Sequence, residues 1–144
     1  MSIRQETGAY QVLATAQISA LGNGTGATAS AFDNGTSANL FIKAGFVFSS
    51  LFGAAPNSGS ALELYLLAGY NAGATTAFSD GNSAIFPPTQ YAGSFIVRNV
   101  TTQQVLSLDD IPLPPVPFMA LLVNKAGQTL SGDNFLAMRP SRFQ

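Results

Sequence analysis

The chain has 144 residues, of which only 9% are charged, and its formal net charge is −1. This length predicts a single domain. Nucleic-acid binding draws on basic patches that release counterions from phosphates, and because the chain has no basic cluster, the sequence argues against DNA or RNA as a partner. Sparse charge also favours association with other protein surfaces.

The chain begins with a polar segment over residues 1–9. It is predicted to form an N-terminal arm that is ordered only when something binds it, followed by one domain over residues 10–144. Residues 1–8 lack the apolar core of a signal peptide, and no stretch approaches the roughly 20 apolar residues that a membrane span needs. We therefore expect no membrane partner and no export through a general secretory route.

Turn signals divide the rest of the chain into about eight short runs, none of which predicts a helix. Residues 10–19 alternate in polarity, which predicts a half-buried strand with Tyr10, Val12 and Ile18 on its apolar face. Residues 40–48 also alternate, but both faces are largely apolar, so this strand is either central or exposes an interface. The predicted strands cover residues 10–19, 28–32, 40–48, 62–67, 91–98, 104–108, 118–123 and 135–138.

The longest irregular segment is residues 69–90, which contains Phe78, Ile85 and Phe86. Loops of about twenty residues without secondary structure are uncommon in compact domains and are usually either functional or disordered. The three apolar side chains predict that this segment packs either into a partner's groove or back onto its own core.

A proline-rich run over residues 111–117 leads into six consecutive apolar residues, 118–123. Since proline cannot donate to a sheet ladder, the proline run is predicted to be an extended lead-in at a sheet edge or rim. Apolar residues without alternation predict a strand buried on both faces, so residues 118–123 are the predicted central strand. Many short strands between turn signals favour an all-β antiparallel sandwich, with an eight-stranded, jelly-roll-like sandwich as the first choice.

The chain contains no histidine and no cysteine, which excludes Ser-His-Asp triads, thiolate nucleophiles and the usual zinc sites. Asp109 and Asp110 are the only adjacent carboxylates. Successive strand residues point to opposite faces, so we interpret them as solvating the turn before the proline run. Residues 80–82 and 133–134 hold possible calcium ligands but lack the spaced acidic pattern of a calcium loop. We therefore expect no cofactor, no metal and no enzyme activity.

The amino-acid sequences of several segments of the chain resemble those of a known group of proteins. They are residues 62–69 (LELYLLAG), the Pro87-Pro88 step, residues 110–118 (DIPLPPVPF), residues 124–128 (NKAGQ) and residues 134–139 (NFLAMR). Together they resemble small virion proteins of tailed bacteriophages that are encoded near the major capsid gene. The likeness covers residues 60–139 and carries no catalytic signature.

This resemblance implies a capsid decoration, or cement, protein, which is a small β-rich protein bound to the outside of an assembled icosahedral capsid. Members of this class generally form dimers or trimers over symmetry axes, bridge neighbouring subunits of the major capsid protein and resist internal DNA pressure. The expected location is therefore the capsid exterior of the virion. The expected partners are the major capsid protein and further copies of this chain.

The resemblance transfers no functional residues, so the expected contacts are hypotheses from the residues themselves. The arm would add to a neighbouring sheet edge, the segment at 69–90 would insert into a partner, and arginines would pair with acidic groups of the shell. An isolated surface ion pair contributes only about 0–1 kcal/mol. The candidate partner-binding residues are Ile3, Arg4, Phe78, Ile85, Phe86, Arg98, Arg139 and Arg142.

Two other functions remain open on the sequence. One is a tail, baseplate or head-completion component of a phage, which has the same composition but far fewer copies. The other is a β-sandwich module that binds carbohydrate on an aromatic face formed by Tyr65, Tyr70 and Tyr91. Core and interface packing is the alternative role for these tyrosines.

Overall fold

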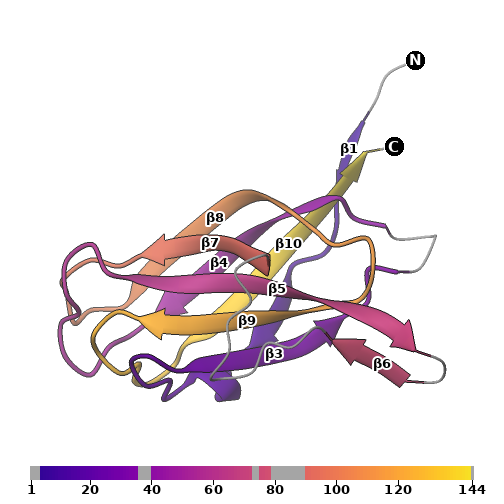
Figure 1. Cartoon of the computed structure of the whole chain (residues 1–144). Helices are drawn as coiled ribbons and strands as arrows, with labels where there is room; N and C mark the ends of the chain where they lie inside the picture. Colours follow the sequence, from indigo (N-terminus) through magenta and orange to yellow (C-terminus); the bar gives the residue numbers. More distant parts are fainter. Residues whose placement is uncertain (1–3, 36–39, 73–74, 79–89, 144) are drawn as a thin grey trace.

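The structure is a computed structural model that describes residues 4–35, 40–72, 75–78 and 90–143. Within these residues two antiparallel sheets pack face to face (Figure 1), which confirms the predicted all-β sandwich. One short 3-10 helix, η1 (Ala16–Ile18), accompanies them. The strands are β1 (Gln5–Thr7), β2 (Gln11–Ala14), β3 (Gly26–Phe32), β4 (Lys43–Ser50), β5 (Ala61–Ala72), β6 (Thr75–Phe78), β7 (Tyr91–Ile96), β8 (Gln104–Pro112), β9 (Phe118–Lys125) and β10 (Phe135–Phe143).

The strand order is that of a jelly roll. Sheet A has the order β2-β10-β4-β8, and sheet B has the order β3-β9-β5-β7, so each sheet joins strands from both ends of the chain. Two further strands extend this plan: β1 pairs with β10 beyond β2, and β6 pairs with β5. They lie in the segments predicted as an arm and a loop, which is why about eight strands were predicted rather than ten.

The predicted central strand is confirmed as β9, which lies between β3 and β5 in sheet B. Phe118 and Leu122 face the core between the sheets, whereas Leu121 and Val123 belong to a second apolar cluster on the other face of sheet B. All four side chains are buried. The absence of alternation therefore reflects burial on both faces, as expected for such a run.

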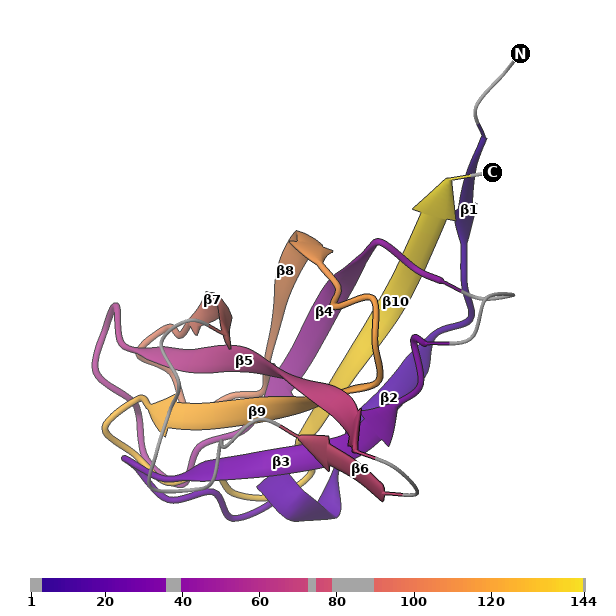
Figure 2. The ribbon, with the colours of Figure 1, turned by 45° about the vertical axis from the view of Figure 1, so that its right-hand side comes forward.

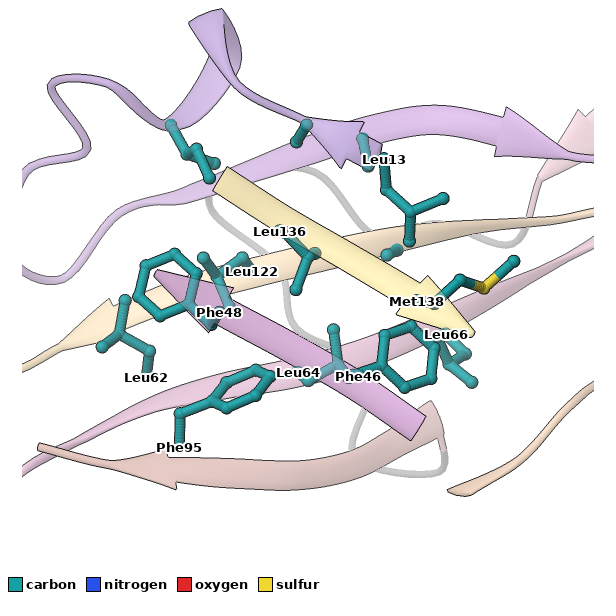
Figure 3. Close-up of a cluster of buried hydrophobic side chains, with 14 of the residues drawn as sticks. Leu13, Phe46, Phe48, Leu62, Leu64, Leu66, Phe95, Leu122, Leu136 and Met138 are labelled. Atoms are coloured by element: carbon teal, nitrogen blue, oxygen red, sulfur yellow. The ribbon is translucent and has the colours of Figure 1, made fainter. Parts of the chain in front are cut away.

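The space between the sheets is filled mainly by phenylalanine and leucine. Phe48 of sheet A packs on Phe95 of sheet B with ring centroids 5.6 Å apart, a tilted arrangement typical of buried aromatic pairs. Figure 3 shows these side chains converging from the two sheets. Those labelled there are Leu13, Phe46, Phe48, Leu62, Leu64, Leu66, Phe95, Leu122, Leu136 and Met138.

The strand predicted over residues 10–19 is wrong in length and in orientation. β2 ends at Ala14, and η1 follows it. Tyr10 and Val12 are exposed, while Leu13 and Ala14 both enter the core. The cause is a β-bulge in β2, where Leu13 is an extra residue between Val12, which opposes Ala137, and Ala14, which opposes Leu136. Alternation within the sequence does not reveal such a bulge.

β10 continues past the predicted end at residue 138, although Pro140 lies within it. Pro140 sits opposite the gap between β1 and β2, where its carbonyl oxygen accepts a hydrogen bond from the Gly8 N–H at 2.7 Å. The missing proline N–H thus falls where the edge strand is interrupted. Gly8 suits this close approach, because a Cβ there would lie 3.0 Å from both Pro140 and the Phe41 ring.

The proline run lies at a sheet edge, as predicted. Pro112 ends β8, which is the edge strand of sheet A, and residues 113–117 then cross to sheet B, where β9 begins. An edge strand tolerates proline because one row of its N–H groups has no partner in the sheet.

Buried asparagines, rather than ion pairs, fasten the loops. Asn124 donates from Nδ2 to the carbonyl oxygens of Leu21 (2.9 Å) and Gln128 (2.7 Å), and its Oδ1 accepts from the Ala126 N–H (2.9 Å). Asn34 and Asn134 bind main-chain groups in the same way; the Oδ1 of Asn134 accepts from the Leu51 N–H at 2.7 Å. These side-chain amides form hydrogen bonds with buried main-chain groups that have no partner in a β-ladder.

Replacing Asn124 by Ala is expected to lower the free energy of unfolding by about 2 kcal/mol or more, because it leaves buried main-chain groups without partners. In thermal unfolding the midpoint should fall by roughly 6–8 °C. The matched control is Asn99→Ala, since Asn99 is exposed, and its midpoint should stay close to that of the wild type. Equal midpoints for the two variants would contradict the fastening role of Asn124.

Candidate interaction surface

The structure describes only some of the candidate partner-binding residues. Ile3, Ile85 and Phe86 lie outside the described residues, as does the side chain of Phe78, whose backbone ends β6. Packing by the segment at residues 79–89 therefore stays a prediction. The four arginine candidates are all described. Arg4, Arg139 and Arg142 lie in two regions of sheet A, whereas Arg98 follows β7 of sheet B.

The first region is a two-stranded projection formed by β1 and the last residues of β10, here called the β1/β10 tip (residues 4–7 and 141–143). Figure 2 shows it extending beyond the sandwich. Glu6 accepts from Arg142 Nε at 2.8 Å and forms an ion pair with Nη2 at 2.7 Å. The Arg142 guanidinium also lies 5.8 Å from the centre of the Phe41 ring. Residues 5–7 of the predicted arm thus pair within their own chain.

Arg4, Arg139 and Arg142 lie at the same end of the molecule. Arg4 and Arg139 line a hollow of about 420 Å³ beside Glu6, and Arg142 pairs with that same Glu6. Arg98 follows β7 and does not belong to this group. Its main chain forms hydrogen bonds with the side chain of Gln104, which lies at the opposite end of β4, roughly 25 Å away. The tip also ends in Phe143, which is 55% exposed.

The second region is the outer face of sheet A, which is turned away from sheet B. Directly opposed residues in an antiparallel ladder share a face, and the register therefore places Val12, Ala137, Val47 and Ser107 in one row and Phe135, Ser49 and Val105 in the next. Val12 is 56% exposed and Val105 is 67% exposed. The apolar band of this face consists of Val12, Val47, Val105 and Phe135. Ala137 lies between Val12 and Val47, and Ser49 lies between Phe135 and Val105, but both are buried.

The apolar second face predicted for residues 40–48 is the only sequence signal that pointed to this band, through Val47. Val12 was assigned to the buried side of its strand, and Val105 and Phe135 carried no signal at all. They become neighbours because β10 pairs with β2 and β4, and β4 pairs with β8, so their proximity depends on strand pairing across the whole chain.

At the tip end of the band lies a hollow of about 420 Å³ lined by Tyr10, Asp109, Asp110 and Arg139, among others. Asp109 and Asp110 were predicted to solvate a turn, but they lie within β8, where both oppose Gly45 in a β-bulge. Asp110 has a φ of 57°, which is uncommon outside glycine. The bulge turns both carboxylates toward one hollow, and Asp110 pairs there with Lys43.

At the other end of the band lies a hollow of about 370 Å³ whose lining includes Asp133, Phe135 and Gln103. Gln103 donates from Nε2 to the Ser49 hydroxyl at 2.7 Å. Asp133 and Arg139 make no ion pair with any described residue. The outer face thus presents an apolar band with a free carboxylate at one end and a free guanidinium at the other.

The tyrosines predicted as a sugar platform do not form one as far as they are described. Tyr65 is only 6% exposed and lies in the second apolar cluster of sheet B. Its hydroxyl donates to Glu63 at 2.8 Å, and its ring packs edge-on against Tyr91 at 5.7 Å. Tyr91 is half exposed, and the side chain of Tyr70 lies outside the described residues. The Tyr65 ring therefore cannot stack on a ligand.

Burial and the hydrogen bond to Glu63 raise the pKa of Tyr65 to about 12 from an ordinary value of 10.0. Because the folded-state pKa exceeds the unfolded one, this phenol favours the fold below pH 10 and loses that effect as the pH rises to about 12. Between these values the free energy of unfolding should fall by up to about 2–3 kcal/mol more in the wild type than in Tyr65→Phe. Denaturant unfolding measures this, and equal pH dependence in both proteins would contradict it.

Within the described part of the chain, no cluster of three or more acidic side chains is arranged to hold a metal ion. Over the same residues, no helix has the length and apolar character needed to cross a membrane. Comparisons with protein-family models, with curated proteins and with solved structures find no match to this chain.

Proposed function

We propose that this protein is a capsid decoration protein, which binds the outer surface of an icosahedral bacteriophage capsid and stabilises it by bridging subunits of the major capsid protein. The observation that carries the proposal is the β1/β10 tip, which extends from the sandwich with Arg4 and Phe143 exposed. A projecting pair of strands with an apolar end and a cation suits insertion between neighbouring subunits of a shell.

Composition and fold support the same proposal. Jelly-roll sandwiches are frequent among viral structural proteins, although a fold alone does not identify a function. The sparse surface charge suits a protein that is covered by neighbours on several sides. A protein present in many copies on a lattice gains from avidity, so each contact can be weak while the shell as a whole is strongly reinforced.

The copy number in purified phage particles tests this function directly. Quantitative mass spectrometry should find this protein in a ratio to the major capsid protein that is near one or a simple fraction of one. A handful of copies per particle would instead place the protein in the tail, baseplate or head-completion apparatus. Complete absence from particles would overturn a virion role altogether.

The role of the tip is tested by replacing Phe143 with Ser and measuring binding to purified shells that lack the protein. Loss of an exposed aromatic anchor should weaken binding about tenfold or more, because aromatic residues often dominate interface energies. The matched control is Ile96→Ser on β7, since Ile96 is 58% exposed and lies outside the tip. If both variants bind shells equally well, the tip is not the contact.

A further inference from the structure

The second apolar cluster lies on the outer face of sheet B, which is turned away from sheet A. Its buried members are Tyr65, Leu67, Leu121 and Val123, with Met119 packed against them. The register places these side chains on one face, because Tyr65 opposes Leu121 and Leu67 opposes Met119. None of the four buried members is more than 6% exposed. This outer face is therefore both apolar and covered.

The described strands do not supply the cover. Sheet A packs against the opposite face of sheet B (Figure 2), and β6 pairs with β5 beyond the cluster. The outer face of sheet A shows how an uncovered face differs. There Val12 is 56% and Val105 is 67% exposed, and even Val47 on the central strand β4 is only half-buried. Leu67 and Leu121, at 1% and 0% exposed, need cover from another part of the chain.

We propose that residues 79–89 of the same chain dock on this face of sheet B. Both ends of that segment lie beside the cluster. β6 ends at Phe78, which opposes Gly69 of β5, and β7 begins at Tyr91, which opposes Tyr65 of β5. The buried residues of β5 on this face lie at or between these two points. The inference does not depend on the proposed function.

Length also selects this segment among those outside the described residues. Its eleven residues reach about 36–40 Å when extended, whereas its two ends are separated by four residues of β5, or roughly 13 Å. Residues 1–3 continue from the tip, and residues 73–74 only join β5 to β6. Residues 36–39 lie between Asn34 and Phe41, which are hydrogen-bonded to each other at 2.9 Å.

The composition of the segment suits an apolar sheet face. Its large apolar side chains are Ile85 and Phe86, and Pro87 and Pro88 follow them. A segment that lies across a sheet face has no ladder partner for its main chain, and proline removes an N–H that would otherwise be buried without one. Ile85 and Phe86 then belong to the folded domain rather than to a contact with a capsid subunit.

A matched pair of double variants tests whether these side chains are buried. I85A/F86A and I96A/F143A each truncate one isoleucine and one phenylalanine, but Ile96 and Phe143 are more than half exposed. I85A/F86A should lower the thermal unfolding midpoint by roughly 10 °C or more, because it removes two side chains from an apolar interface. I96A/F143A should shift the midpoint by no more than about 2 °C. Equal midpoints for the two variants would overturn the proposal.

Nuclear Overhauser effects locate the segment in the wild-type chain, whatever the variants do. Protons of Ile85 or Phe86 should show effects to methyl groups of Leu67, Leu121 or Val123. Samples that mix isotope-labelled and unlabelled chains separate contacts within a chain from contacts between chains. Contacts of the two side chains only with other parts of the fold, or with none, would overturn the proposal. Contacts that arise only between chains would do the same, because the occupant would then come from a second copy.

Discussion

The ladder of main-chain hydrogen bonds along β10 is the constraint on which the rest of the structure depends. β10 pairs with β1 and β2 on one side and with β4 on the other, so it joins both ends of the chain within sheet A. Its inner face contributes Leu136 and Met138 to the core. Its outer face contributes Phe135 of the apolar band and Arg139, and its end forms the tip together with β1. Core, outer face and tip therefore share one register.

The scarcity of charge shapes how this fold is held together. With so few ion pairs available, the loops depend on buried asparagine amides, and the core depends on phenylalanine and leucine from both sheets. Neutral amides bind main-chain groups without the desolvation penalty of a buried charge. Several charged groups lie at the tip and at the two ends of the outer face, whereas Glu63 pairs with Lys125 on sheet B.

The sequence by itself determined the all-β class, the jelly-roll-like sandwich, the burial of residues 118–123 on both faces and the edge position of the proline run. Each follows from local properties: hydrophobic periodicity, turn residues and the missing N–H of proline. It also identified Arg4, Arg139 and Arg142 as candidate contacts, but as separate residues. Nothing in the residues around each arginine indicated that the three share one end of the molecule.

Only the tertiary structure decided which strands became neighbours and in which register. The pairing of Glu6 with Arg142 joins opposite ends of the chain, and local patterns contain no information about such distant partners. The bulge at Asp109 and Asp110, the bulge in β2 and the continuation of β10 through Pro140 each depend on what the adjacent strand offers. Alternation within one strand predicts its two faces. The pairing register between strands determines which residues of neighbouring strands lie side by side on one surface.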